Sequence, residues 1–259
     1  MISGRDSALK RTIAITNQKG GVGKTTTVLS LIGALHERGE RVLGVDLDPQ
    51  GSLGFSAGLD IENIVTVDEV FKGRHTVEEA IAETRVGDIL PSNILLSTAE
   101  LELNMPGREF LLRDALRKVE ENYDYIIIDT PPALNVLTFN AYVAAQQLII
   151  PMAPEILSLL GISQIRDTVE TVRRYYNPEL EVLGILLNRY SSHLILNREV
   201  EEMALDIAKK LGTRVFRNKI RTGVAVAESP AHGESVVTYA PGSKPALDFQ
   251  SLLNEILRY

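Results

Sequence analysis

Asn17-Gln18-Lys19-Gly20-Gly21-Val22-Gly23-Lys24-Thr25-Thr26-Thr27 is the stretch that decides the fold. A short β-branched run at 12–16 precedes it, and an amphipathic helical pattern follows. Strand, glycine loop and helix in this order indicate a phosphate-binding loop, because the backbone N–H groups point inward and the helix adds its positive dipole end. We expect Lys24 to neutralise the β- and γ-phosphates of a nucleotide and the Thr25 hydroxyl to ligate Mg²⁺. The alternative is a glycine-rich turn that binds nothing.

The loop departs from the commonest phosphate-binding pattern. That pattern has a glycine where this chain has Gln18, and here a second lysine, Lys19, stands ahead of the glycines. The arrangement resembles the deviant Walker A motif of the ParA/MinD ATPases. In that family the extra lysine reaches across a dimer, so the resemblance implies that Lys19 acts on a partner's nucleotide. It also implies that ATP is bound by Gly20, Gly21, Val22, Gly23, Lys24, Thr25 and Thr26.

Acidic residues end two further apolar strands, at 41–45 and 125–128. Asp46 and Asp48 follow the first and Asp129 follows the second, and the carboxyl ends of strands are where open α/β sheets place ligand chemistry. Taken alone, the first pair fits a polar turn as well as a metal shell, and Asp129 fits a cap. The resemblance implies that Asp48 positions the attacking water and that Asp46 and Asp129 lie at the Mg²⁺ site, with Asp129 acting mostly through bound water.

Strands and helices alternate along the rest of the chain. Strands are expected at 147–151 and 182–187, and the last helix at 245–258. This alternation predicts a doubly wound, mostly parallel α/β sheet with helices on both faces, the fold of P-loop NTPases. Residues 1–10 are expected to be a flexible tail and residues 11–259 a single domain, since no linker or internal repeat interrupts them.

Two asparagines and one poorly patterned region complete the prediction. Asn188 follows the strand at 182–187, where its amide could pair with adenine N6 and N7; it matches the family position that does so, although asparagine is also a common loop residue. Asn197 is expected to cap a helix that runs to Leu211. Within 52–110 we expect short helices at 67–71 and 76–82 and a strand at 88–91, and we assign no chemistry there.

Composition excludes several classes of protein. The 259 residues include no cysteine, which excludes disulfides, thiolate metal sites and iron–sulfur clusters and suits a reducing cytoplasm. The longest apolar stretch, 148–162, is broken by two prolines and a glutamate, so we expect no membrane span. A nitrogenase iron protein needs cluster cysteines, a membrane-cycling MinD needs a basic amphipathic C-terminal helix, and a bacterial tyrosine kinase ends in several tyrosines. None of these patterns is present.

A local basic segment stands out in a chain of net charge −7. No acid lies between residues 207 and 227, and six cations suggest a footprint for DNA phosphates. They are Lys209, Lys210, Arg214, Arg217, Lys219 and Arg221. The alternative is a solvated face that balances nearby Glu199, Glu201 and Glu202. His193 and Ala225 stand where family members often carry DNA-contacting arginines, so the family's usual patch is not reproduced residue by residue.

The resemblance to ParA-type partition ATPases extends from about residue 11 to the last helix and includes residues 228–233. It implies an ATP-dependent homodimer that binds duplex DNA without sequence preference, a ParB-like activating partner and a cytoplasmic location. Intrinsic hydrolysis should be slow, because no arginine finger is evident. Two alternatives stay open: an ATPase that positions a protein cargo, and a metabolic ATP-dependent ligase of the same superfamily.

Overall fold

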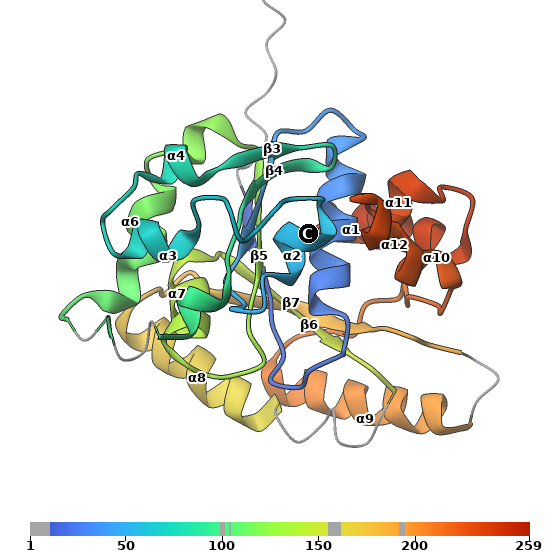
Figure 1. The fold of residues 1–259 in the computed structure, drawn as a ribbon. Helices are drawn as coiled ribbons and strands as arrows, with labels where there is room; N and C mark the ends of the chain where they lie inside the picture. Colours follow the sequence, from blue (N-terminus) through green and yellow to red (C-terminus); the bar gives the residue numbers. More distant parts are fainter. Residues whose placement is uncertain (1–10, 99–101, 104, 155–161, 192–194) are drawn as a thin grey trace, which may run out of the picture.

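The computed structural model describes residues 11–98, 102–103, 105–154, 162–191 and 195–259, and its core is one twisted sheet (Figure 1). Within these residues the sheet has seven strands in the order β3-β4-β2-β5-β1-β6-β7. Every neighbouring pair is parallel except β3 and β4. The strands are β1 Arg11–Ile15, β2 Val42–Asp46, β3 Ala82–Thr84, β4 Gly87–Leu90, β5 Tyr125–Asp129, β6 Gln147–Met152 and β7 Glu181–Leu187. The predicted mostly parallel sheet is confirmed.

Helices cover both faces of the sheet, as Figure 1 shows. The α-helices are α1 Lys24–His36, α2 Ser52–Ser56, α3 Val67–Phe71, α4 Val77–Ala80, α6 Leu111–Leu116, α7 Val136–Ala144, α8 Ile162–Tyr175, α9 Ile195–Leu211, α10 Val224–Glu228, α11 Val236–Tyr239 and α12 Lys244–Ile256. Short 3₁₀ helices are η1 Ile94–Thr98, η2 Arg108–Phe110, η3 Glu120–Asn122 and η5 Ser229–His232. Helices α1, α11 and α12 pack on one face, and α3, α6, α7, α8 and α9 pack on the other.

Alternation along β1 shows why both faces are apolar. Ile13 and Ile15 enter the core beneath α1 and α12, whereas Ala14 enters the core beneath α7 and α8. Because successive side chains of a strand point to opposite faces, a strand covered by helices on both sides must be apolar throughout. No helix in the described part of the chain is long and apolar enough to cross a membrane.

The structure corrects the sequence prediction at two elements. The helix expected to reach residue 82 ends at Ala80, and Ala82 begins the antiparallel edge strand β3, because pairing with β4 outweighs local helix preference. The prediction that Asn197 caps a helix is wrong, since α9 already begins at Ile195. The preference of asparagine for N-cap positions did not determine where α9 begins, because asparagine is also tolerated inside helices. Helices α2, α7, α10 and α11 were not predicted.

The strand register brings the acidic strand ends together. Asp129 of β5 is paired in register with Ile15 of β1 on one side and with Asp46 of β2 on the other. The phosphate-binding loop leaves β1 at this edge, where β1 lies between β5 and β6. This is a topological switch point, at which doubly wound sheets bind their ligands outside the carboxyl ends of the strands.

Candidate nucleotide site

The loop between β1 and α1 has the backbone that a phosphate cradle requires. Gly21 has φ 75° and Gly23 has φ 90°, both in the left-handed region that side chains other than glycine avoid. Helix α1 begins at Lys24, directly after Gly23. The Thr27 hydroxyl and N–H both donate to the Gly23 carbonyl oxygen, at 2.7 Å and 2.9 Å. The loop therefore leads directly into the N-terminal end of a helix, whose dipole favours anions.

Lys24 is buried at the base of this loop, with 7% of its surface exposed. Its Nζ donates to the Lys19 carbonyl oxygen at 3.3 Å. Burial lowers the pKa of Lys24, while the nearby charges of Asp129 and Asp48 act in the opposite direction. Lys24 therefore offers a desolvated ammonium group, near two carboxylates, to an anionic ligand.

Thr25 and Asp129 form the polar floor of the site. The Thr25 hydroxyl donates to Asp129 Oδ2 at 2.6 Å, although the two residues are 104 positions apart. Asp129 is fully buried, and its Oδ1 has no hydrogen-bond partner among the described residues. Burial and the neighbouring Asp46 raise the pKa of the Asp129 carboxyl. An orphaned carboxylate oxygen beside a hydroxyl suits a hard cation such as Mg²⁺ and its waters, so these residues fit the expected ion.

Asp46 lies beside Asp129, but its oxygens are already occupied. Asp46 Oδ1 accepts the Asp48 N–H at 3.0 Å, and Oδ2 accepts the Leu53 and Gly54 N–H groups at 2.9 Å and 3.4 Å. Burial raises the pKa of Asp46 to about 7, against the effect of these N–H donors. The contacts show that Asp46 organises the loop that carries Asp48; its place at the Mg²⁺ site stays a prediction.

Asp48 is held at the rim of the pocket by its own backbone. Its carbonyl oxygen accepts the Gly51 N–H at 2.9 Å and the buried Ser92 hydroxyl at 2.5 Å. Its Oδ1 accepts the Gln50 N–H at 3.1 Å. The side chain lines the same pocket as Lys24 and Thr25. This geometry orients one carboxylate oxygen of Asp48; its role in positioning a water molecule stays a prediction.

Asn188, at the end of β7, contacts the phosphate-binding loop directly. Its Nδ2 donates to the Val22 carbonyl oxygen at 2.9 Å and to the Thr27 hydroxyl at 3.3 Å. Its Oδ1 is buried and has no hydrogen-bond partner among the described residues. Pairing with adenine through both amide atoms would break the Val22 contact. A single acceptor, Oδ1, is thus what Asn188 offers to an exocyclic amine such as adenine N6.

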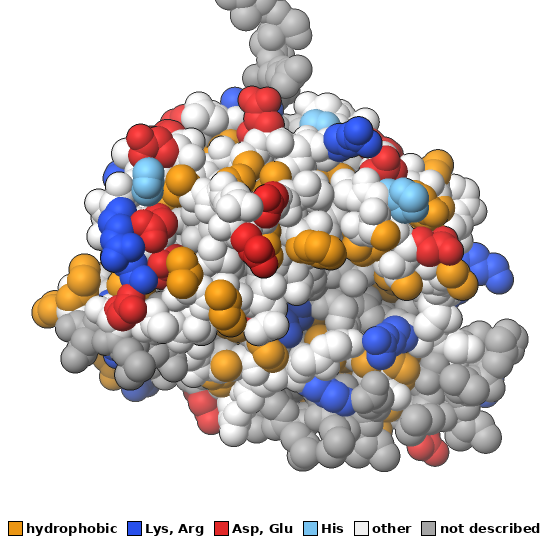
Figure 2. Space-filling view, viewed as in Figure 1, with side chains coloured by type: hydrophobic (Ala, Val, Ile, Leu, Met, Phe, Trp, Pro, Cys, Tyr) orange, Lys and Arg blue, Asp and Glu red, His pale blue; other side chains and the backbone are white. Residues whose placement is uncertain are grey.

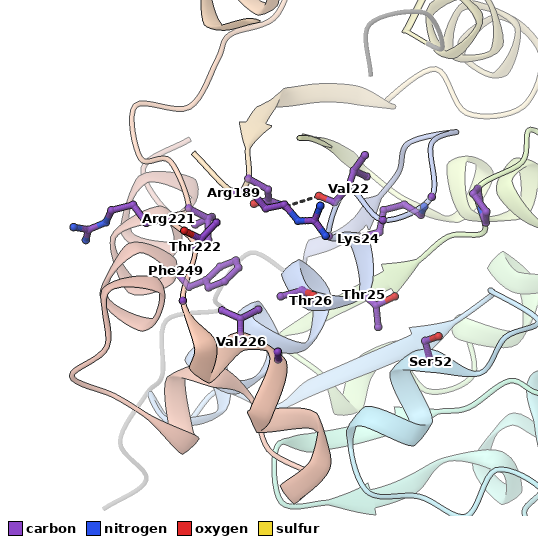
Figure 3. Close-up of a pocket in the computed structure, with 18 of the residues that line it drawn as sticks. Val22, Lys24, Thr25, Thr26, Ser52, Arg189, Arg221, Thr222, Val226 and Phe249 are labelled. Atoms are coloured by element: carbon purple, nitrogen blue, oxygen red, sulfur yellow. Dashed lines mark hydrogen bonds between the residues drawn. The ribbon is translucent and has the colours of Figure 1, made fainter. Parts of the chain in front are cut away.

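The glycine loop, Lys24, Thr25, Asp48 and Asn188 line one cavity of about 520 Å³, shown in Figure 3, whereas the buried Asp46 and Asp129 are not part of its described lining. The described lining includes residues to which the sequence assigned no nucleotide contact: Ser52, Arg189, Ile220, Thr222, Gly223, Val226, Ala227 and Phe249. Arg189 has φ 54°, the one positive value among the described non-glycine residues, and strained backbone of this kind clusters at functional sites. Figure 3 shows its side chain extending from the end of β7 toward Val22. Its position directly after Asn188 was the signal that could have identified it.

The six basic residues expected to bind DNA do not form one uniform patch. The segment that carries Arg214 and Lys219 runs parallel to β7, with one bridge from Val215 to Ile185 of β7 and another from Arg221 to Tyr190, and ion pairs join it to α9 and α12. Lys219 therefore pairs with Glu201 of α9, whereas Arg221 pairs with Asp248 of α12 at 2.6 Å. The absence of acids from the segment itself is thus compensated by acids from two helices.

The remaining cations differ in their surroundings. The guanidinium carbon of Arg214 lies 3.7 Å from the centre of the Tyr259 ring. Lys209 lies 3.9 Å from Asp206, with both side chains largely exposed. Lys210 and Arg217 form no ion pair within the described residues. Of the two expected arginine positions, Ala225 lies in α10, and His193 lies outside the described residues.

Comparisons with known proteins agree with this geometry. A family model described as an AAA domain matches residues 10–182. The chromosome partitioning protein ParA of Myxococcus xanthus is 38% identical over 252 residues, covering 96% of this chain and 88% of that protein. The sporulation initiation inhibitor protein Soj of Bacillus subtilis is 39% identical over 251 residues, covering 94% and 97%. A structure described as cobyrinic acid a,c-diamide synthase from Mycobacterium smegmatis, with bound ADP and magnesium, is 39% identical with a TM-score of 0.83 and covers 96% of this chain and 94% of its own.

Proposed function

The chain belongs to the ParA/MinD family of P-loop ATPases, and from this premise we propose that it is an ATP-driven dimerising switch that binds duplex DNA and positions DNA cargo. One observation carries the proposal. Lys24 lines the nucleotide pocket of its own chain, whereas Lys19, on the same loop, is not among the described residues that line it. A second lysine held just outside its own site is suited to the phosphates of a facing subunit.

In this proposal, different residues of the chain bind the nucleotide, hold Mg²⁺ and position the water molecule. The loop N–H groups and Lys24 bind the phosphates of ATP, and Asn188 Oδ1 accepts a hydrogen bond from the base. Thr25 and Asp129 would hold Mg²⁺, which when bound offsets the charge of the β- and γ-phosphates. Asp48, oriented by Gln50 through Oδ1, presents Oδ2 to a water molecule. Closure of two subunits excludes bulk water and adds Lys19 in trans, so a lone subunit should hydrolyse ATP slowly.

Exposed cations of the segment support the DNA part of the proposal. Lys210 and Arg217 form no ion pair among the described residues, and Lys209 has only an exposed one, 3.9 Å from Asp206. On the face viewed in Figure 2, separate Lys and Arg side chains also lie below α2, around the loop that leads into α1, but the lysines of that loop are assigned to the nucleotide and are not counted for DNA. A dimer would present about six cations of the segment that are unpaired or only weakly paired, so log affinity for DNA should fall with log salt at a slope of about −5.

A filter-binding titration tests this proposal. ATP-loaded Asp48→Ala protein is mixed with duplex DNA of unrelated sequences over a range of salt concentrations. The double variant Lys210→Ala/Arg217→Ala should flatten the slope by roughly four units, two from each subunit, without changing ATP affinity. Arg41→Ala, which removes an exposed cation that precedes β2 and pairs with Asp124 at 2.6 Å, is the control outside the basic segment and should keep the full slope. Absence of DNA retention at low salt would refute DNA binding.

A ParB-like protein is the activating partner that we propose, because relatives are named for chromosome partitioning. A fragment of DNA that carries a partner-binding site, with the protein from the neighbouring reading frame, should raise ATP turnover. Turnover that is unaffected by DNA but stimulated by a protein assembly would instead indicate a protein cargo.

One finding favours a metabolic alternative. The Mycobacterium smegmatis structure, described as a cobyrinic acid a,c-diamide synthase, is similar over nearly the whole chain. An enzyme of that class would couple ATP hydrolysis to amidation of a carboxylate. Turnover that depends strictly on a small carboxylate substrate and an amine donor, and not on DNA or dimerisation, would establish that alternative.

A further inference from the structure

Asn17 connects strand β6 with the glycine loop, two parts of the site that lie far apart in the sequence. It is almost completely buried, with 1% of its surface exposed, between the end of β1 and the glycine loop. Its Nδ2 donates to the Pro151 carbonyl oxygen of β6 at 2.8 Å. Its Oδ1 accepts the Lys19 N–H at 2.9 Å. Both ends of one carboxamide are thus used, one on the sheet and one on the lysine that precedes the glycines.

The contact with Pro151 attaches the chain to β6 at the point where the backbone of β1 ends. The Thr16 N–H donates to the Ile149 carbonyl oxygen at 3.0 Å, a backbone bond from the end of β1 to β6. Acceptors in a parallel ladder recur every second residue, so Pro151 carries the next acceptor of β6 after Ile149. The Asn17 side chain donates to that acceptor and therefore continues the attachment to β6 into the glycine loop.

The contact with Lys19 closes an Asx turn. A side-chain oxygen that accepts the N–H two residues on bends the backbone as a β-turn does, and here it sets the direction in which the Lys19 side chain leaves the loop. The Lys19 carbonyl oxygen is held from the other side by Lys24 Nζ at 3.3 Å. The Lys19 peptide is therefore fixed at its N–H by Asn17 and at its carbonyl by the lysine that binds phosphate.

We propose that Asn17 is the positioning residue for Lys19: its carboxamide anchors the loop to β6 and fixes the Lys19 backbone, from which the ammonium reaches the nucleotide of a second subunit when the dimer closes. This inference rests on the proposed function, in which Lys19 acts in trans. Asn17 touches neither nucleotide pocket nor phosphate in its own chain, since it is absent from the described residues that line the cavity. Its removal should therefore affect dimer closure and leave nucleotide binding almost unchanged.

The experiment separates these two properties with the full-length protein, Mg²⁺ and a non-hydrolysable ATP analogue. Nucleotide affinity is measured by calorimetry at protein concentrations at which the protein is monomeric, and the dimer dissociation constant by sedimentation velocity at saturating analogue. Asn17→Ala should weaken the dimer by about tenfold or more, the size of one to two lost hydrogen bonds, and change analogue affinity by less than about threefold. Lys19→Ala is the reference for complete loss of the trans contact.

A second substitution separates the two hydrogen bonds of Asn17. In Asn17→Ser, the hydroxyl can still accept the N–H of residue 19 but is too short to reach Pro151, so dimer affinity should lie between those of the wild-type protein and Asn17→Ala. Asn140→Ala is the matched control. Asn140 is also buried, accepts the Leu112 N–H at 3.0 Å, donates to the Arg108 and Val136 carbonyls at 2.9 Å, and is not among the described residues that line the cavity. It should lower thermal stability without changing dimer affinity.

Each contrary result has a distinct meaning. If Asn17→Ala loses analogue affinity as strongly as dimer affinity, Asn17 is a general support of the loop and the inference fails. Wild-type dimer affinity in Asn17→Ala, with a monomeric Lys19→Ala, also overturns it. If Lys19→Ala itself dimerises normally, the trans role of Lys19 fails, and with it this part of the proposed function. Should Asn17→Ala not fold, the comparison of Asn17→Ser with Asn140→Ala decides the matter by the same criteria.

Discussion

Substitution of Gly23 by alanine should damage the site through two separable effects. A Cβ at position 23 would lie 2.7 Å from Asn188 Nδ2, closer than side-chain contacts allow. The backbone at this position also has φ 90°, which alanine adopts only at a cost. Since the Asn188 amide donates to the Val22 carbonyl, pushing it aside breaks the contact that ties β7 to the loop.

The magnitude follows from these two costs. The left-handed backbone costs alanine about 1–2 kcal/mol, and loss of one hydrogen bond costs about 0.5–1.5 kcal/mol. The loop of the free variant relaxes to avoid both, so ATP binding must restore the strained form. The sum, about 1.5–3.5 kcal/mol, corresponds to a loss of roughly 10- to 400-fold in ATP affinity.

The same loop contains graded controls. A Cβ at Gly21 would meet no atom within 4 Å, but its φ is 75°, so Gly21→Ala carries the backbone cost alone. A Cβ at Gly20 would meet nothing within 4 Å, and Gly20 is not among the glycines with positive φ. Titration of each variant with a fluorescent ATP analogue should show losses that increase in the order Gly20→Ala, Gly21→Ala, Gly23→Ala. Equal losses for Gly21→Ala and Gly23→Ala would refute the argument that Asn188 limits position 23, and equal losses for Gly20→Ala and Gly21→Ala would refute the backbone cost.

Three further substitutions test the remaining assignments. Lys24→Ala should lose ATP binding by calorimetry, because the β/γ-phosphate charge is left uncompensated, and retention of millimolar or better affinity would contradict the phosphate-binding loop. Asp48→Ala should bind ATP, lose turnover and accumulate as a dimer in light scattering, and normal turnover would remove Asp48 from the mechanism. Asn188→Ala should weaken ATP binding by about tenfold, because the contact with the Val22 carbonyl is lost. It should also reduce the preference for ATP over GTP, since Asn188 Oδ1 accepts a hydrogen bond from the amine of adenine and not from the carbonyl of guanine. An unchanged ATP/GTP ratio would show that Asn188 supports the loop and does not select the base.

The least predictable elements were those whose conformation depends on distant partners. The helix predicted for 76–82 includes Ala82, but this residue begins β3, because β4 offers an antiparallel edge to pair with. The start of α9 at Ile195 likewise did not follow the capping preference of Asn197. By contrast, the strands β1, β2, β5, β6 and β7 were predictable, since strands buried on both faces are apolar runs that end abruptly at polar residues.

The basic segment also shows that the sequence alone does not predict a functional surface. Its positive charges are evident from residues 207–227, but the sequence does not show how many of them are neutralised. In the structure Lys219 and Arg221 pair with Glu201 and Asp248, which belong to helices on either side of β7. Sequence proximity would have placed all six cations on one surface. Which cations remain unpaired depends on which of the two neighbouring helices, α9 or α12, each side chain of the segment faces.

The sequence by itself determined the phosphate-binding loop, its strand and helix, the acidic strand ends and the alternating α/β fold. These features are local: a glycine, a β-branched run or a buried apolar strand has the same conformational preference wherever the chain leads. Only the tertiary structure decided how the site is assembled. Asn188 reaches Val22 across 166 positions, Thr25 reaches Asp129 across 104, and Asn17 reaches Pro151 across 134. Such contacts depend on strand order and register, which are set by the packing of all the elements together, and no local pattern records them.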